Sequence, residues 1–405
     1  MSSIIADYTS GANLLEGLHT FLTKGHTLRP SFTGTGNGYC DDAIGTTSSV
    51  HEIITLTFTS ATAFSVSGSV SGSMGTGATA TLFTHARFQC TIQVGTVAWV
   101  AGDTITWTMT APWEIVTYTS GQSYIYTAPG DDGNQDVNVG WTVKSNSTGG
   151  YYGVRMGAYP TILPAGGFWR SNTLCWMPLG SYSGSNVRLI AVASGQACWF
   201  CAVIGTYYMH AVAGYADIPG TLDTQPAPYI IGAARCWTSE PVDTSTDWLY
   251  TNSVGGPLYP TDPRYNGGEN YGYGGSLFVR NSTNKWSSVS VNYNYDPNAY
   301  ATSCLYKSTA FMSRSALGPN LDGSMPCFPY VIDRYPPPAN ATTVAVYPDI
   351  YGSIPFVWLI PSYDASGNLL LSQSTFRSLS SRSKMMVLQT KNDSSDSSLF
   401  ALEMF

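Results

Sequence analysis

The sequence predicts a mainly β protein, with antiparallel β-sandwich or barrel-like domains and one short N-terminal helix. Two observations lead to this fold class. Apolar and polar residues alternate with a period of two over many short segments, which is the pattern of strands with one buried face. Glycine-rich turn signals separate those segments, and 41 of the 405 residues are glycine.

One segment near the start has the period of a helix instead. Its apolar residues, from Leu14 to Leu22, recur on one side of a 3.6-residue repeat. Asn13 stands where an N-cap is expected, and Gly25 stands where the helix is expected to end. We therefore expect a single amphipathic helix between these two residues.

The segment that follows predicts a compact antiparallel unit inserted into the chain. Ile54, Leu56 and Phe58 alternate with threonines, and the same period returns at Ile105 and Trp107. The texture changes after residue 112, where Tyr, Trp, Pro and Gly become frequent. We expect three parts: residues 1–50 with the helix and the start of the main β domain, residues 51–112 as an inserted small antiparallel β domain, and residues 113–405 as the main β domain with long Tyr/Gly/Pro-rich loops.

Two features of the main domain are specific enough to test. Val187–Ala193 and Ala197–Ile204 are apolar runs on either side of a turn signal at Gly195, which predicts a hairpin. The alternation from Phe400 to Met404 predicts a last strand with its apolar residues on one face and Glu403 on the other.

The composition limits what the protein does. Only 11% of residues are charged, against ~25% in an average soluble protein, and the net charge is −7. An acidic chain lacks the basic face that phosphate binding needs, so we expect no direct contact with nucleic acid. No apolar run reaches membrane-spanning length, and the first residues do not have the pattern of a secretory signal. Low charge favours a chain whose surface is covered by other subunits.

Motifs that carry chemistry are weak. Cys198 and Cys201 form a C-x-x-C, but in a strand these positions face opposite sides, so we interpret them as buried thiols, like most of the eight cysteines. The five histidines are scattered, which favours structural roles for each of them: His19, His26, His51, His85 and His210. We therefore expect no catalytic residue, no cofactor and no metal site.

Carboxylates and aromatic residues leave alternatives open. Asp41-Asp42 and Asp131-Asp132 lie in or beside Gly-rich turns, where we expect them to accept backbone N–H bonds, with a glycosidase pair as the alternative. Calcium binding is the alternative for the longer acidic set Asp131, Asp132, Asn134 and Asp136. Aromatic pairs are typical of sugar stacking or of subunit contacts, and these pairs are Phe168-Trp169, Tyr207-Tyr208, Tyr271-Gly-Tyr273 and Tyr293-Asn-Tyr295.

The segment from His51 to Thr110 resembles a small β module of tailed-bacteriophage virion proteins. The resemblance rests on Ala63-Phe-Ser-Val-Ser-Gly-Ser-Val-Ser-Gly72 and on Ala98-Trp-Val-Ala-Gly-Asp-Thr-Ile-Thr-Trp107. The flanks are similar to one group of phage structural proteins, through the segments Leu14–Gly38, Asn186–Val192, Tyr207–Pro228, Met386–Gln389 and Phe400–Phe405. The resemblance implies a multi-copy structural protein of the virion, in the tail or baseplate, with no catalytic residues.

We therefore expect a virion structural protein, assembled in the host bacterial cytoplasm, whose partners are copies of itself and other virion proteins. The alternatives are a head decoration or neck protein, or a receptor- or carbohydrate-binding tail appendage that uses the Tyr-rich loops of residues 250–300 to contact a host surface glycan. For the appendage, we expect the isolated protein to bind host cells, and Tyr271→Ala or Tyr295→Ala to abolish that binding. A secreted glycan-active enzyme is the remaining alternative, and it requires glycan cleavage that depends on a carboxylate.

Overall fold

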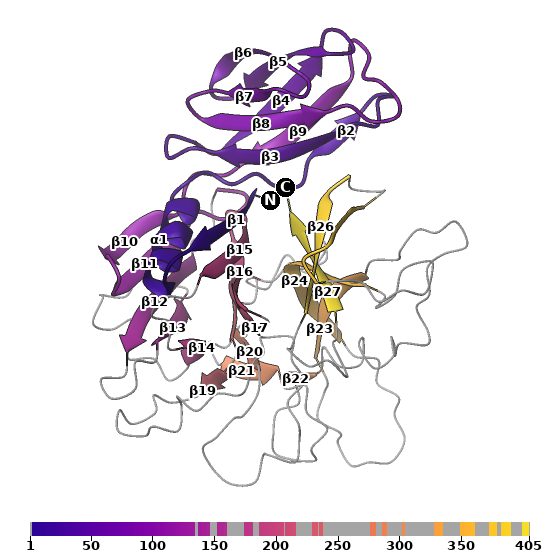
Figure 1. Ribbon diagram of the computed structural model, residues 1–405. Helices are drawn as coiled ribbons and strands as arrows, with labels where there is room; N and C mark the ends of the chain where they lie inside the picture. The colour runs from indigo at the N-terminus through magenta and orange to yellow at the C-terminus, as the bar shows by residue number, and fades with distance from the viewer. Residues whose placement is uncertain are drawn as a thin grey trace, which may run out of the picture.

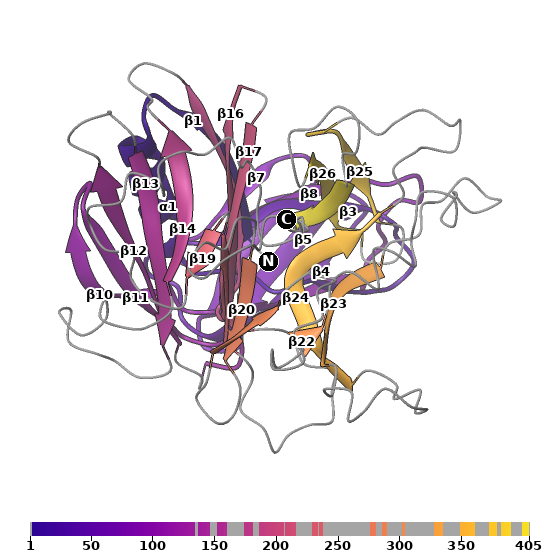
Figure 2. The same cartoon turned by 90° about the horizontal axis from the view of Figure 1, so that it is seen from below.

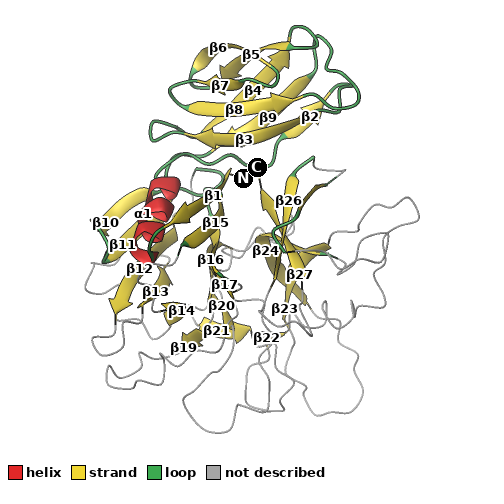
Figure 3. Cartoon of the chain, viewed as in Figure 1, coloured by secondary structure: helices red, strands yellow, loops and turns green. Residues whose placement is uncertain are grey.

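A computed structural model describes residues 2–133, 137–145, 152–159, 174–180, 186–205, 207–215, 229–233, 235–237, 276–280, 286–289, 302–303, 328–334, 349–360, 372–378, 382–389 and 399–404. The predicted fold class is confirmed: the described chain is mainly β with a single short helix (Figures 1 and 3). Its strands form four sheets, and the strand orders are linear rather than closed in this part of the chain. Among the described strands, every pair is antiparallel except β21 with β22, which is parallel.

The sheets combine segments that lie far apart in the sequence. The thirteen-stranded sheet contains, in spatial order, β1 (Ser2–Tyr8), β15 (Val187–Ala193), β16 (Ala197–Ile204), β17 (Tyr207–Tyr215), β18 (Tyr229–Ala233), β20 (Ser276–Arg280), β21 (Trp286–Val289), β22 (Thr302–Ser303), β23 (Phe328–Arg334), β24 (Asp349–Leu359), β27 (Leu399–Met404), β26 (Lys384–Gln389) and β25 (Thr375–Arg377). The six-stranded sheet contains β10 (Glu114–Thr119), β11 (Ser123–Ala128), β12 (Val137–Ser145), β13 (Tyr152–Tyr159), β14 (Leu174–Gly180) and β19 (Arg235–Trp237).

The two smaller sheets form the inserted module, by which we mean strands β2 to β9, residues 31–109. The five-stranded sheet contains β2 (Ser31–Thr33), β9 (Thr104–Met109), β4 (Glu52–Phe58), β5 (Ala63–Gly68) and β6 (Gly72–Ala78). The three-stranded sheet contains β3 (Tyr39–Gly45), β8 (Phe88–Gln93) and β7 (Leu82–Thr84). The module has its own core between these sheets and stands at one end of the molecule (Figure 1).

The module takes strands from both sides of residue 51, where sequence analysis placed its start. Ser31 of β2 pairs with Thr106 of β9, and Tyr39 of β3 pairs with Gln93 of β8. Pairing between such distant residues leaves no signal in the local pattern. The alternation seen in the sequence holds for the central strands, because Ile54, Leu56 and Phe58 are all buried in the module core.

The helix α1 covers Gly11–Leu22, close to the prediction, but both of its ends differ. Ser10 is the N-cap: its backbone is extended and its Oγ accepts a hydrogen bond from the Asn13 backbone N–H at 3.2 Å. Asn13 therefore lies in the first turn rather than at the cap. At the other end, the hydroxyl of Thr23 donates to the carbonyl of His19, and the helix ends at Leu22, three residues before Gly25.

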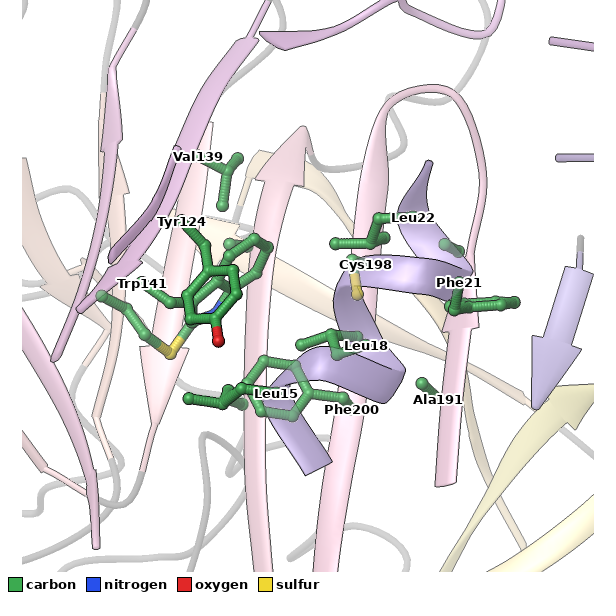
Figure 4. Close-up of a cluster of buried hydrophobic side chains, with 14 of the residues drawn as sticks. Leu15, Leu18, Phe21, Leu22, Tyr124, Val139, Trp141, Ala191, Cys198 and Phe200 are labelled. Carbon is green, nitrogen blue, oxygen red and sulfur yellow. The ribbon is translucent and has the colours of Figure 1, made fainter. Parts of the chain in front are cut away.

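The main body has three layers (Figure 2). Strands β15 to β18 form the middle layer and are buried on both faces, which explains their continuous apolar runs. One face packs against α1 and the six-stranded sheet, and Leu18, Phe21, Trp141 and Phe200 belong to the buried cluster between them (Figure 4). The other face packs against β24, β26 and β27, so that the long sheet folds back over itself.

Both specific predictions for the main domain are confirmed. β15 and β16 pair as an antiparallel hairpin across Gly195, with Arg188 opposite Val203. In β27, Phe400, Leu402 and Met404 lie together in the second core, by which we mean the core between the middle layer and β24, β26 and β27. Glu403 points to the other face, where it is nevertheless buried, with only 1% of its surface exposed.

Candidate functional site

The C-x-x-C cysteines occupy two separate cores. Cys198 faces the core beneath α1, whereas Cys201 faces the core shared with β24 and β27. Burial raises the pKa of both thiols well above the usual range, which suppresses the thiolate. The prediction of opposite faces is confirmed. Four cysteines are free and buried (Cys40, Cys90, Cys198 and Cys201), and the side chains of the other four lie outside the described residues.

The histidines are dispersed as predicted. His26 is fully buried between the helix and the module, and His85 accepts a hydrogen bond from the Arg87 backbone N–H. His210 lies 4.0 Å from the sulfur of Cys201 in the second core. Among the described residues, no group of three His, Cys, Asp or Glu side chains is arranged to hold a metal ion.

The acidic pairs have different environments. Asp41 and Asp42 lie in strand β3 at an irregularity of its pairing with β8, beside the glycine-rich loop that ends at Gly38. Asp131 does lie in a turn, where the Ser194 hydroxyl and two backbone N–H groups approach its carboxylate. Among the described residues, these carboxylates form no group of three that could hold a metal ion. Asn134 and Asp136 lie outside the described part of the chain.

Most of the predicted aromatic contacts also lie outside the described residues, including Tyr271, Tyr295 and the Phe168-Trp169 pair. Tyr208 is described and is only 6% exposed. Its hydroxyl accepts a hydrogen bond from Nε2 of Gln373 at 3.0 Å. Tyr208 is therefore a buried contact between strands rather than a platform for a sugar.

A cluster that the sequence analysis did not single out surrounds Glu16 on α1. Its carboxylate accepts hydrogen bonds from the hydroxyls of Tyr118, Ser120 and Tyr124 and from the backbone N–H of Gly121, at 2.6–3.1 Å. Half-burial alone would raise the pKa of Glu16, but these four donors outweigh it and lower the pKa to about 2. The carboxylate is ionised and its oxygens are occupied.

His19 completes this cluster one helical turn further along. Its Nδ1 lies 2.7 Å from the hydroxyl of Tyr126, and its ring stacks on Tyr118 at 4.1 Å between centroids. Burial lowers the pKa of His19, against the attraction of the Glu16 charge. These contacts fasten the β10–β11 hairpin to the helix. Both carboxylate oxygens of Glu16 accept hydrogen bonds, Oε1 from three donors and Oε2 from Tyr118.

The junction between the module and the main body concentrates charge. Arg29, just before β2, forms a bidentate ion pair with Glu403 of β27. Glu403 also accepts hydrogen bonds from Nε1 of Trp358 and from the hydroxyl of Ser383. On the same side, Arg377 pairs with Asp41 of the module at 2.6 Å. The sequence gives no signal for these pairs, because their partners are more than 300 residues apart.

The open edges of the sheets are the surfaces best suited to contact other molecules. β10 is the outer strand of the six-stranded sheet, and all six of its residues are at least partly exposed. Ile115 and Tyr118 are 46% and 42% exposed. The strand is β-branched and aromatic, and Glu114 is its single charge. The pairing with β11 has an irregularity between Ile115 and Thr117, and no described strand pairs with the outer edge of β10.

The module has a second open edge at β6, which contains neither charge nor proline. Five of its seven residues are exposed. Further exposed apolar side chains lie elsewhere on the module, at Ile53, Val70, Leu82, Val94, Val97 and Val100. The described surface of the module is therefore low in charge and carries apolar side chains.

Comparison with known proteins gives no match: no protein-family model fits the chain, and no curated protein is significantly similar to it in sequence. Within the described residues, the model contains no helix of the length and apolar character needed to cross a membrane.

Proposed function

We propose that this chain is a structural component of a tailed-bacteriophage virion, a multi-copy tail or baseplate protein that assembles through low-charge β surfaces. The observation that carries this proposal is the open edge of β10, with a single charge and no proline in six residues. Proteins that stay monomeric protect such edges with lysine, proline or a covering segment, because exposed N–H and C=O groups pair with other strands. Symmetric assembly covers the edge with a neighbouring copy.

Two further observations support the assignment to a virion. The segment that resembles a phage β module forms a two-sheet unit with its own core, set apart from the main body (Figure 1). The carboxylate of Glu16 accepts four hydrogen bonds and holds the β10–β11 hairpin on the helix. Both features suit a structural role.

Assembly through β10 is tested by light scattering after size-exclusion chromatography of the full chain. We expect a discrete oligomer for the wild type, and dissociation for Ile115→Lys, because a lysine on an edge strand opposes further pairing. Ile53→Lys is the matched control: Ile53 is 51% exposed, but its strand β4 is paired on both sides. A wild-type chain that stays monomeric at all concentrations contradicts the proposed assembly.

The place in a virion needs a separate measurement. Particles of the phage that encodes the chain are purified and analysed by quantitative mass spectrometry and by density at side-chain resolution. We expect the chain at a fixed stoichiometry in the tail or baseplate. Absence of the chain from intact particles overturns the virion assignment, even if the isolated protein forms an oligomer.

A further inference from the structure

The C-terminal hairpin, by which we mean β25 and β26 with the turn that joins them, faces one end of the module. This end of the module holds the side chain of Arg382. Nη1 of Arg382 donates to the carbonyl oxygens of Gly36 and Gly38, at 3.0 and 3.2 Å. Its guanidinium carbon lies 4.5 Å from the centre of the Phe32 ring and 5.9 Å from that of Trp99. Two carbonyls and two aromatic rings therefore surround one guanidinium group, an arrangement that favours a planar cation.

The module builds this cradle from its own residues. The carboxylate of Asp103 accepts hydrogen bonds from the backbone N–H groups of Thr35, Gly36 and Val100, at 3.0–3.1 Å, and so fixes the loop that presents the carbonyls. Burial alone would raise the pKa of Asp103, but these bonds and the charge of Arg382 lower it. The cradle thus contains a fixed negative charge close to the bound cation.

Close packing explains why the loop contains glycines. A Cβ atom on Gly36 or Gly38 would lie 2.5 Å from an atom of the Trp99 ring, so only glycine lets the backbone approach the indole. The Trp99 ring is itself stacked on Phe58 at 4.4 Å between centroids, inside the module core. The floor of the cradle is therefore rigid and does not depend on the hairpin.

The hairpin carries a second arginine that the module binds beside the first. Arg377 pairs with Asp41 and lies 3.2 Å from the centre of the Tyr39 ring. Its Nη1 also donates to the backbone carbonyl of Arg382, which links the two sites. Arg382 has a φ of +57°, a backbone conformation that is unfavourable for residues other than glycine. Contacts that keep an arginine in this conformation must outweigh its strain.

We propose that the cradle of Phe32, Gly36, Gly38, Trp99 and Asp103 is a guanidinium-binding site, filled in this chain by Arg382. By holding Arg382, with Arg377 beside it, the module recognises the C-terminal hairpin, and this contact fixes the orientation of the module on the main body. The site takes planar cations of the alkylguanidinium class when Arg382 is absent. An alkylammonium ion is a poorer ligand, because it lacks a planar face to lie on the rings and the fixed fork of donors.

Chemical rescue tests the site in the full chain. Arg382→Gly removes the side chain, and glycine tolerates a φ of +57° without strain. Propylguanidinium restores the missing atoms, and calorimetric titration measures its binding. We expect saturable binding to Arg382→Gly and a higher thermal midpoint with propylguanidinium than with the same concentration of butylammonium. The wild type should show neither effect, because its site is filled.

Arg87→Gly is the matched control, since Arg87 lies in the same module but donates to Ser71 rather than to the cradle. Arg382→Ala repeats the titration with a smaller backbone change, in case the glycine variant does not fold. No saturable binding in either Arg382 variant, or equal binding in Arg87→Gly, overturns the guanidinium site.

The orientation role has its own readout. Small-angle scattering of the double variant Arg377→Gly/Arg382→Gly should show a broader distribution of interatomic distances than the wild type, because the module is released. A scattering curve identical to that of the wild type overturns the orientation role, while the binding titration decides the site itself.

Discussion

Replacing Glu16 by glutamine removes the one charge that fastens the β10–β11 hairpin to α1. In the wild type, three hydroxyls and one backbone N–H donate to this carboxylate. A charged acceptor makes stronger hydrogen bonds than a neutral amide, and the amide also turns an NH₂ group toward donors. Glu16→Gln should therefore loosen the hairpin without changing the volume of the side chain.

The size of the effect follows from the pKa. The pKa of Glu16 falls from its ordinary value of 4.5 to about 2 on folding, a depression that corresponds to at most about 3.4 kcal/mol at ~1.36 kcal/mol per pH unit. Solvent screens a half-buried group, so we expect about 1–2 kcal/mol. The contribution is complete above pH 4.5 and is lost as the pH falls toward 2, because the unfolded chain binds the proton first.

Thermal unfolding measured between pH 2 and pH 7 tests this reasoning. At pH 7, Glu16→Gln should lower the midpoint by about 2–8 °C, at ~2–4 °C per kcal/mol for a cooperative unit of 150–250 residues. The difference from the wild type should shrink toward pH 2. Glu114→Gln is the control, since Glu114 is an exposed carboxylate on the adjacent strand β10. Equal effects of the two substitutions, or a difference that does not change with pH, would refute the argument.

Two buried groups should give opposite pH dependences. Burial lowers the pKa of His26 to about 3, so wild-type stability should fall as the pH drops from about 6.5 to 3. His26→Phe should remove that loss in urea titrations across this range. Burial raises the pKa of Asp131 to about 6 despite the donors that face it. Its charge therefore destabilises the fold above pH 6, and this penalty disappears as the pH falls toward 3.8. Asp131→Asn should raise the urea midpoint relative to the wild type at pH 7.5 and have a smaller effect at pH 4. A difference in urea midpoint between His26→Phe and the wild type that does not change with pH contradicts the first expectation, and the same result for Asp131→Asn contradicts the second.

Local patterns in the sequence predicted the elements better than their partners. Alternation identified the strand of Ile54 and Leu56, and the apolar period identified the helix, because both signals lie within a few residues. The cap was assigned to Asn13 rather than Ser10, since both residue types are suited to that position and only the backbone conformation of Ser10 decides.

Long-range partners left no such signal. Nothing in the sequence near Asp7 indicates that β1 lies beside β15, where Asp7 pairs with Arg188. In the same way, Glu403 has the position of an exposed residue in an alternating strand. It is buried because Arg29, Trp358 and Ser383 reach it from elsewhere in the chain. Pairwise partners of this kind depend on the assembled fold and not on the local period.

These pairs give the low charge of the chain a more specific meaning. Arg29, Arg377 and Arg382 all make contacts between the module and the C-terminal strands, where Asp41 and Glu403 or fixed carbonyl oxygens receive them. A charge that is already paired inside the molecule does little to repel a second copy. The edges at β6 and β10 have one charged residue between them. Charge therefore fixes the parts of one chain relative to each other. Under the proposed assembly, contacts between chains would use backbone pairing and apolar side chains at the sheet edges.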